Sequence, residues 1–311
     1  MELLILCAGA GEKSWDGAKS DRPLRTKGKR QAQKIGAWMG RMGVCPDIVL
    51  TSLDLRARVT AQKALKSAGW TARAIQKSPE LSAGTLPDFP DARKILLVGS
   101  STEMRCLLDE LGLTAEPELR AGVLLHLTRN KGRISLVTRV DPQDLPNHFP
   151  YPAPDGPEQR ERPAYYYTQS AVIPYRRTNK GTEILITGSS SGRHWVVPKG
   201  IVEPGLSPAA SAMTEAREEA GVEGRVETPA LGTFSYEKWG ASCQVEVFAM
   251  EVTNILPDVA WEENHRNRKW VSVFDAASLL QHPAFRKMAM EIQAALDCNQ
   301  VDGTQSSKHP K

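Results

Sequence analysis

Three glutamates with helical spacing are the side chains of this sequence best suited to chemistry. They are Glu215, Glu218 and Glu219, and their i, i+3, i+4 spacing places all three carboxylates on one face of an α-helix. Like charges held this close repel one another, and a divalent cation relieves that repulsion. Oxygen-only ligands favour Mg²⁺ or Mn²⁺ over zinc. The spacing therefore predicts a candidate metal site, with a solvated acidic surface as the alternative.

The neighbouring residues predict where this acidic helix begins and ends. Ser207 suits the N-cap, Pro208 suits the first turn, and Gly221 supplies the stop. Residues 209–220 favour propagation. We expect the opposite face to pack through small apolar residues, namely Ala212, Met213, Ala216 and Ala220. A glycine loop that starts at Gly200 leads into the helix.

Residues 200–222 resemble the Nudix box, G-x5-E-x7-R-E-U-x-E-E-x-G-U, in which U is an aliphatic residue. The matching positions are Gly200, Glu215, Glu218, Glu219, Gly221 and Val222. Ala216 fills an aliphatic position with a smaller side chain. Two departures are larger, because Leu206 replaces the first glutamate of the pattern and Thr214 replaces its arginine.

The resemblance implies a metal-dependent hydrolase of phosphoanhydride bonds, possessing Mg²⁺ or Mn²⁺ as cofactor. Its metal ligands would be the carboxylates of Glu215, Glu218 and Glu219, with a backbone carbonyl at or next to Gly200. Glu218, Glu219 and the more distant Glu263 are the candidate catalytic carboxylates. The two departures leave a second class open, a non-catalytic sensor or scaffold that binds phosphorylated ligands.

Basic side chains near the box are candidates for contacts with substrate phosphates. Lys199 directly precedes the glycine loop, and Arg193 opens the same apolar strand. Residues 261–270 combine two glutamates with Arg266, Arg268 and Lys269. That segment resembles the corresponding region of diphosphoinositol-polyphosphate and diadenosine-polyphosphate hydrolases, which makes Arg268 a third candidate. The substrates implied are nucleoside or dinucleoside polyphosphates, or diphosphoinositol polyphosphates, and ordinary surface charge is the alternative for each basic residue.

Composition indicates a globular chain of two domains. The 311 residues are 41% hydrophobic and 24% charged, with a net charge of +4. These values exclude a fibrous or disordered chain, and the charge suits small polyanions without indicating nucleic acid. Five scattered cysteines without a Cys-x-x-Cys pair favour the reducing cytoplasm. The apolar run 3–8 is too short to span a bilayer, so we expect no membrane segment.

The first 140 residues alternate apolar strands with helices, which predicts a three-layer α/β domain with a mostly parallel sheet. Four of its segments resemble the short, SixA-like branch of the histidine phosphatases: residues 20–24, 46–52, 56–61 and 98–99. Arg56 matches part of the phosphate pocket of that family. Three roles are left open for this domain: a vestigial anion-binding cleft, a solvated basic surface, or a docking site for a protein partner.

That phosphatase family works through a phosphorylated histidine in an Arg-His pair and a second histidine later in the chain. The alignment places the pair on Gly9 and Ala10 and the second histidine on Ser100. The sequence holds no histidine before His126, and without an imidazole nucleophile a phosphohistidine cannot form. We therefore predict that residues 1–140 form a domain without phosphatase activity.

A proline-rich stretch separates the two predicted domains. Residues 141–163 carry seven prolines and are expected to form an extended, fairly stiff linker. Residues 164–298 hold the acidic helix among predicted strands, and the Nudix resemblance implies an α/β/α sandwich with a mixed sheet. The polar tail, residues 299–311, is expected to be disordered.

Overall fold

The structure is a computed structural model that describes residues 1–71, 73–87, 93–113, 118–130, 132–151, 157–189 and 191–305, with side chains to residue 294. The chain divides into two compact units, residues 1–164 and 165–311. Each unit has its own sheet and its own buried core. None of the helices in the described ranges is both long and apolar enough to cross a membrane.

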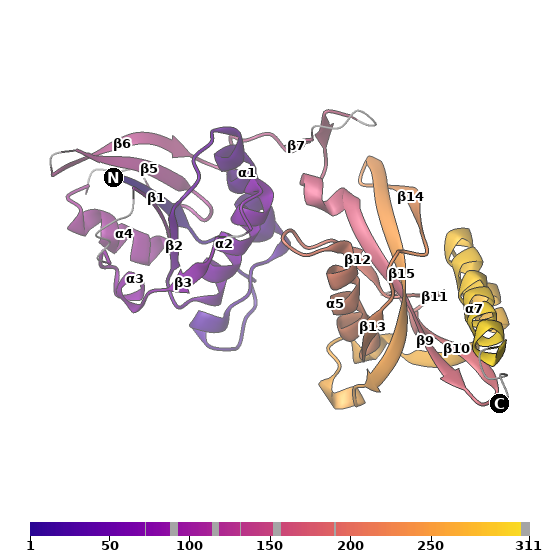
Figure 1. Ribbon diagram of the computed structural model, residues 1–311. Coiled ribbons are helices and arrows are strands. Elements are labelled where there is room, and N and C mark those ends of the chain that lie inside the picture. The colour runs from indigo at the N-terminus through magenta and orange to yellow at the C-terminus, as the bar shows by residue number, and fades with distance from the viewer. Residues whose placement is uncertain are drawn as a thin grey trace, which may run out of the picture. The chain divides into compact units, whose positions relative to one another are not determined.

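The first unit is built on a six-stranded sheet (Figure 1). In the order β3-β2-β4-β1-β5-β6, its strands are Ile75–Lys77, Ile48–Thr51, Lys94–Gly99, Glu2–Cys7, Leu124–Asn130 and Arg133–Val140. The first four run parallel, and β5 and β6 are antiparallel. The expected mostly parallel sheet is confirmed.

Helices cover both faces of this sheet, because the side chains of each buried strand alternate between them. Leu4 and Leu6 of β1 pack with α1 (Thr26–Arg41) and α2 (Leu55–Ala68). Leu3 and Ile5 of the same strand pack with α3 (Pro79–Ala83) and α4 (Ser101–Glu110). This is the three-layer arrangement predicted for the N-terminal domain. A short 3₁₀ helix, η1 (Lys19–Asp21), precedes α1.

The residues aligned with the phosphatase histidines make structural contacts. A Cβ atom on Gly9 would lie 2.6 Å from the carbonyl oxygen of Gly28, so no larger residue fits there without a backbone shift. The N–H of Ala10 donates to Gln31 Oε1 at 3.0 Å. Ser100 caps α4, accepting from the N–H of Glu103. These contacts tie the loop after β1 to α1 and fix the start of α4.

The described part of the proline-rich stretch packs against α1 within the first unit. Its short strands β7 (Phe149–Pro150) and β8 (Gln159–Arg160) pair with each other. The buried Lys34 ammonium of α1 donates to the carbonyl oxygens of Pro142 and Leu145 at 3.1 and 2.9 Å. The boundary between the two units therefore falls after residue 164, at the end of this stretch.

The second unit has an eight-stranded mixed sheet. Its strands β9 to β16 are Thr168–Thr178, Gly181–Gly188, Trp195–Val196, Lys199–Ile201, Val222–Val226, Gly232–Lys238, Ala241–Ile255 and Arg268–Ser272. Strand β9 runs parallel to β15, and the other pairings are antiparallel. Three 3₁₀ helices lie outside the sheet: η2 (Ala164–Tyr167), η3 (Asp258–Ala260) and η4 (Asn264–Arg266).

Helices lie on both faces of the mixed sheet (Figure 1). α5 (Pro208–Ala220) packs on one face, while α6 (Val273–Leu279) and α7 (Pro283–Gln305) pack on the other. The predicted α/β/α sandwich is confirmed. α7 continues to Gln305, although Val301, Asp302 and Gly303 are poor helix formers. The disorder expected from residue 299 stays a prediction. Residues 306–311 lie outside the described part of the chain.

Candidate functional site

The acidic helix α5 has the predicted bounds and caps. The hydroxyl of Ser207 accepts from the N–H of Ala210 at 3.2 Å, Pro208 is the first helical residue, and Gly221 ends the helix with φ +60°. The buried face consists of Ser211, Ala212, Ala216 and Ala220. Met213 was expected on this face but is 43% exposed, because the close-packed stripe passes through Ser211 instead.

Glu215 lies against the glycine loop. Gly200 sits in β12, which pairs with β9, and a Cβ atom added to it would lie 1.8 Å from Glu215 Oε1. Glycine is therefore required where the carboxyl approaches the backbone. Burial raises the pKa of Glu215 to about 7, with further contributions from Glu219, Glu218 and Glu263. The charge of Lys199 opposes this rise but does not outweigh it.

Glu219 faces the same loop one turn further along the helix. Its Oε2 accepts from the backbone N–H of Lys199 at 3.0 Å. Its Oε1 lies 2.8 Å from Nη2 of Arg266, and both side chains are only 12% exposed. Burial raises the pKa of Glu219, opposed by the Lys199 hydrogen bond and the Arg266 charge. Each carboxylate oxygen thus already has a donor.

A later loop brings Glu263 to the helix. The backbone carbonyl of Glu218 accepts from Trp261 Nε1 at 2.8 Å and from the N–H of Glu263 at 3.2 Å. The Glu263 carboxylate is paired with Nε of Arg266. Burial raises the pKa of Glu218, and Glu262 and Glu263 raise it further. Glu263 and Glu219 thus share Arg266 as a partner, and the catalytic role of Glu263 stays a prediction.

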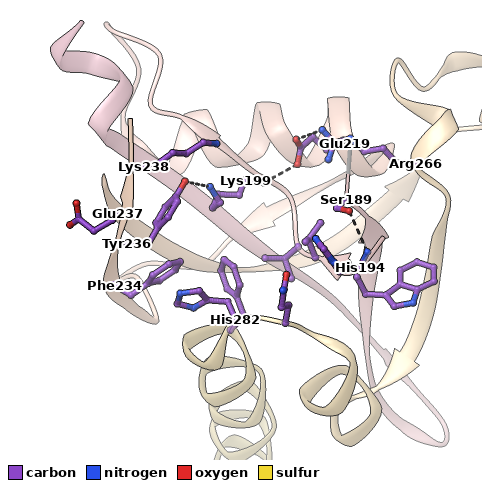
Figure 2. A pocket seen from close by; sticks show the side chains of 15 residues that line it. Ser189, His194, Lys199, Glu219, Phe234, Tyr236, Glu237, Lys238, Arg266 and His282 are labelled. Atoms are coloured by element: carbon purple, nitrogen blue, oxygen red, sulfur yellow. Dashed lines mark hydrogen bonds and ion pairs between the residues drawn. The ribbon is translucent and has the colours of Figure 1, made fainter. Parts of the chain in front are cut away.

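A cleft of about 640 Å³ opens beside these groups (Figure 2). One side holds Glu219, Lys199 and Arg266. The lining also includes aromatic rings, those of Trp195, Phe234, Tyr236, His282 and Phe285. The cleft can therefore accept a ligand that is anionic at one end and apolar or planar at the other.

Comparisons with known proteins identify the family of the second unit. The family model described as the NUDIX domain matches residues 167–291. Diphosphoinositol polyphosphate phosphohydrolase 2 of Mus musculus is 32% identical over 142 residues, which are 44% of this chain and 76% of that protein. The chain belongs to the Nudix family. This confirms the expected enzyme class, a Nudix pyrophosphohydrolase.

Other similar proteins include diphosphoinositol polyphosphate phosphohydrolase 3-beta of Bos taurus, 32% identical over 38% of this chain and 72% of that protein. Among solved structures, a C. elegans Ap4A hydrolase has a TM-score of 0.38 at 23% identity, covering 42% of this chain and 98% of that one. A phosphohistidine phosphatase SixA from Agrobacterium tumefaciens, itself described as putative, has a TM-score of 0.40 at 19% identity, covering 45% and 96%. The absence of phosphatase activity in the first unit stays a prediction.

The carboxylates of the Nudix box fit a hard divalent ion by their chemistry. Among the residues described, no three acidic, histidine or cysteine side chains are gathered closely enough to form a finished metal site. The oxygens of Glu219 are in contact with Arg266 and with the N–H of Lys199. The donor set is nevertheless all oxygen, it is largely buried, and it lies on a backbone cradle at Gly200. Glu215, Glu218 and Glu219 would hold the ion.

Of the three basic residues predicted to bind substrate, only Lys199 lines the Nudix cleft. Its ammonium donates to Gln169 Oε1 at 2.6 Å and to the Tyr236 hydroxyl at 2.9 Å. Burial lowers the pKa of Lys199, while Glu219 acts in the opposite direction. The lysine is thus held with its charged end inside the cleft.

Arg268 and Arg193 lie outside the lining of the cleft, and their predicted roles in substrate binding stay predictions. Nη1 of Arg268 donates to the carbonyl oxygens of Ala220 and Gly221 at 2.9 and 2.7 Å, at the C-terminus of α5. Arg268 therefore supports the acidic helix, where a cation also complements the helix dipole. Arg193 is exposed in a turn, with Nε 3.4 Å from Ser191 Oγ, and is not among the described residues that line the cleft.

The aromatic residues of the cleft were not predicted from the sequence. Arg266 was noted in the basic segment 261–270 but was not among the predicted substrate contacts. Phe234 and Tyr236 are two residues apart in β14, so both point to the same face of the strand. That alternation was readable in the sequence. His282 comes from the turn before α7, and its ring lies 4.3 Å from that of Phe234, a contact that no local pattern indicates.

Proposed function

We propose that the second unit hydrolyses a phosphoanhydride bond of a small polyphosphate, using Mg²⁺ or Mn²⁺ held by Glu215, Glu218 and Glu219. The observation that carries the proposal is that one cleft joins the box carboxylate Glu219 to Lys199 and Arg266. An anionic substrate group in this cleft would meet two cations beside the carboxylates. We also propose that the substrate is a small molecule and that the protein is located in the cytoplasm, which the cysteine pattern favours.

The chain's own residues supply binding and proton transfer. A bound divalent ion would polarise the phosphate and lower the pKa of the attacking water. The ammonium of Lys199 would bind a phosphate oxygen. Glu218, Glu219 and Glu263 are the groups placed to accept the proton of the water, and burial raises the pKa of Glu218 and Glu219 toward the range useful for a general base.

The lining of the cleft favours a nucleotide over an inositol as substrate. Its charged side chains are three cations, Lys199, Lys238 and Arg266, and two carboxylates, Glu219 and Glu237. A diphosphoinositol polyphosphate carries phosphate on nearly every ring carbon, each with a charge of about −1.5 to −2, and this lining has few cations to match. The aromatic side instead suits stacking of a planar base. Nucleoside and dinucleoside polyphosphates are therefore our first candidates, and diphosphoinositol polyphosphates, named in the similar phosphohydrolases, are the second.

Phosphate release from a panel of polyphosphates tests the proposal. With Mg²⁺ or Mn²⁺, the wild-type chain should release phosphate from at least one member, and Glu219→Gln should lower the rate by roughly 10²–10³-fold. Glu237→Gln is the matched control, since Glu237 is an exposed carboxylate of the same cleft and should retain most activity. Full activity in Glu219→Gln would show that the site is assigned to the wrong residues.

The second candidate function is a sensor or scaffold that binds a phosphorylated ligand without turnover. It is favoured by Leu206 and Thr214, which replace the glutamate and arginine of the box. Both are exposed, Leu206 just before α5 and Thr214 within it. Ligand binding by the wild-type chain without phosphate release from any polyphosphate would support this function. The first unit would then be a candidate docking site for a protein partner.

A further inference from the structure

We propose that Arg266 competes with the divalent ion for Glu219 and Glu263, and that ion binding frees its guanidinium to take a substrate phosphate. The inference rests on the proposed function, because it concerns the same metal site. It assigns a binding role to a residue outside the Nudix box, and it makes the affinities for metal and substrate depend on each other.

One guanidinium holds two carboxylates. Nη2 of Arg266 lies 2.8 Å from Glu219 Oε1, and its Nε is paired with Glu263 Oε2. Since the side chains of Arg266 and Glu219 are each 12% exposed, water screens this pair weakly. The backbone N–H of Lys199 occupies the second oxygen of Glu219. A divalent ion that binds Oε1 of Glu219 would therefore share or take an oxygen that Arg266 now holds.

Arg266 supplies a cation to Glu219 from outside the box. The pattern has an arginine at the position of Thr214. In the structure Thr214 is exposed, and its hydroxyl donates to the carbonyl of Ala210 at 3.3 Å within the helix. Arg266 reaches the carboxylates from η4 instead, about fifty residues later in the chain.

The backbone around Arg266 is fixed, so the side chain is the part that can move. The N–H of Arg266 donates to the carbonyl of Glu263 at 2.9 Å. Its carbonyl oxygen lies only 2.2 Å from where a Cβ atom of Gly188 would be, so the two backbones are in close contact. Because Arg266 already lines the cleft (Figure 2), a guanidinium released from the carboxylates remains within reach of a bound phosphate.

If the ion competes with Arg266 and releases its guanidinium, binding of the ion and binding of an anionic ligand should strengthen each other. An ion that displaces the guanidinium gains the carboxylates and leaves a free cation in the cleft, which favours an anionic ligand. By reciprocity, a ligand that binds the freed guanidinium strengthens ion binding by the same factor.

Binding of Mn²⁺ to the full chain, followed by electron paramagnetic resonance of the free ion, tests the competition without requiring activity. Arg266→Met should bind Mn²⁺ about tenfold or more tightly than wild type, since two carboxylates lose their internal cation. Arg266→Lys keeps the charge without the planar fork and should lie between the two. Arg217→Met is the matched control. Arg217 is a half-exposed cation on α5, the helix that carries the three glutamates, and it is paired with Glu223. Its removal should change the affinity for Mn²⁺ by about twofold or less.

The second measurement concerns the substrate. In Arg266→Met, the KM for phosphate release from the best polyphosphate should rise by about tenfold, because the freed cation is missing. Thermal melting verifies that each variant is folded, and Arg266→Lys serves if the methionine variant is not. Mn²⁺ affinity equal to or weaker than that of wild type in both Arg266 variants would overturn the competition, and an unchanged KM would overturn the substrate contact. Failure of the proposed function would look different: the wild type would release no phosphate, whatever its Mn²⁺ affinity.

Discussion

The contact between Glu215 and Gly200 links the backbone of the loop to the charge of the helix. Burial raises the pKa of this carboxyl to about 7, and a bound cation would favour its ionised form. The same carboxyl lies where a Cβ atom of residue 200 would be. A glycine at this position therefore determines where Glu215 can place its oxygens.

Gly200→Ala tests this link. The added methyl must displace the Glu215 carboxylate, and the atoms it meets are the end of a flexible side chain, so the fold should persist with a small change in melting temperature. Metal affinity should fall by about tenfold to a hundredfold, as it does when a ligand loses its orientation. The measurement is Mn²⁺ binding with a melting curve of the same sample. An unchanged Mn²⁺ affinity would mean that Glu215 is not a ligand.

At the scale of elements, the loop between β15 and β16 supports the C-terminal half of α5. Trp261 and the Glu263 N–H donate to the carbonyl of Glu218, and Arg268 donates to the carbonyls of Ala220 and Gly221. Carbonyls in the last turn of a helix have no partner within the helix. The loop supplies these partners and at the same time delivers Glu263 and Arg266 to the cleft.

Arg268→Met should therefore lower the free energy of unfolding of the second unit by about 1–3 kcal/mol, through lost charge-assisted hydrogen bonds and a lost charge at the helix C-terminus. Chemical denaturation measures this loss. Arg193→Met, which removes an exposed arginine with one weak contact, should leave stability within about 0.5 kcal/mol of wild type. KM should be unchanged in both variants. A raised KM with unchanged stability in Arg268→Met would restore the role predicted for it from the sequence.

At the scale of the whole molecule, the chain consists of two units with separate sheets and cores. The first unit keeps buried helices on both faces of its sheet, yet Gly9, Ala10 and Ser100 are engaged in backbone approach and capping. Its fold does not depend on a phosphatase site. The Nudix cleft is lined entirely by residues of the second unit.

Expressed separately, residues 165–311 should retain the polyphosphate hydrolysis of the full chain, and residues 1–164 should not turn over aryl phosphates or phosphohistidine peptides. Phosphate release from both fragments and from the full chain measures this. Robust phosphatase activity of residues 1–164 that Ser100→Ala abolishes would contradict the prediction and reveal an unrecognised nucleophile.

The sequence by itself determined the features that depend on near neighbours. Capping by Ser207 and Gly221 set the bounds of α5, and the spacing of its glutamates set the carboxylate face. Strand and helix periodicity predicted the α/β fold of the first unit, because alternation and helical repeat are local properties of the chain. The resemblance to the Nudix box implied the sandwich of the second unit.

Only the tertiary structure decided which distant side chains join the site. Within residues 261–270, strand alternation would have treated Arg266 and Arg268 alike, since they are two residues apart. The 3₁₀ turn η4 and the left-handed Asn267, with φ +58°, break that alternation. As a result Arg266 turns to Glu219 in the cleft, while Arg268 turns to the end of α5. These two contacts each join residues more than forty positions apart, and contacts of that separation are fixed by how loops close over the sheet.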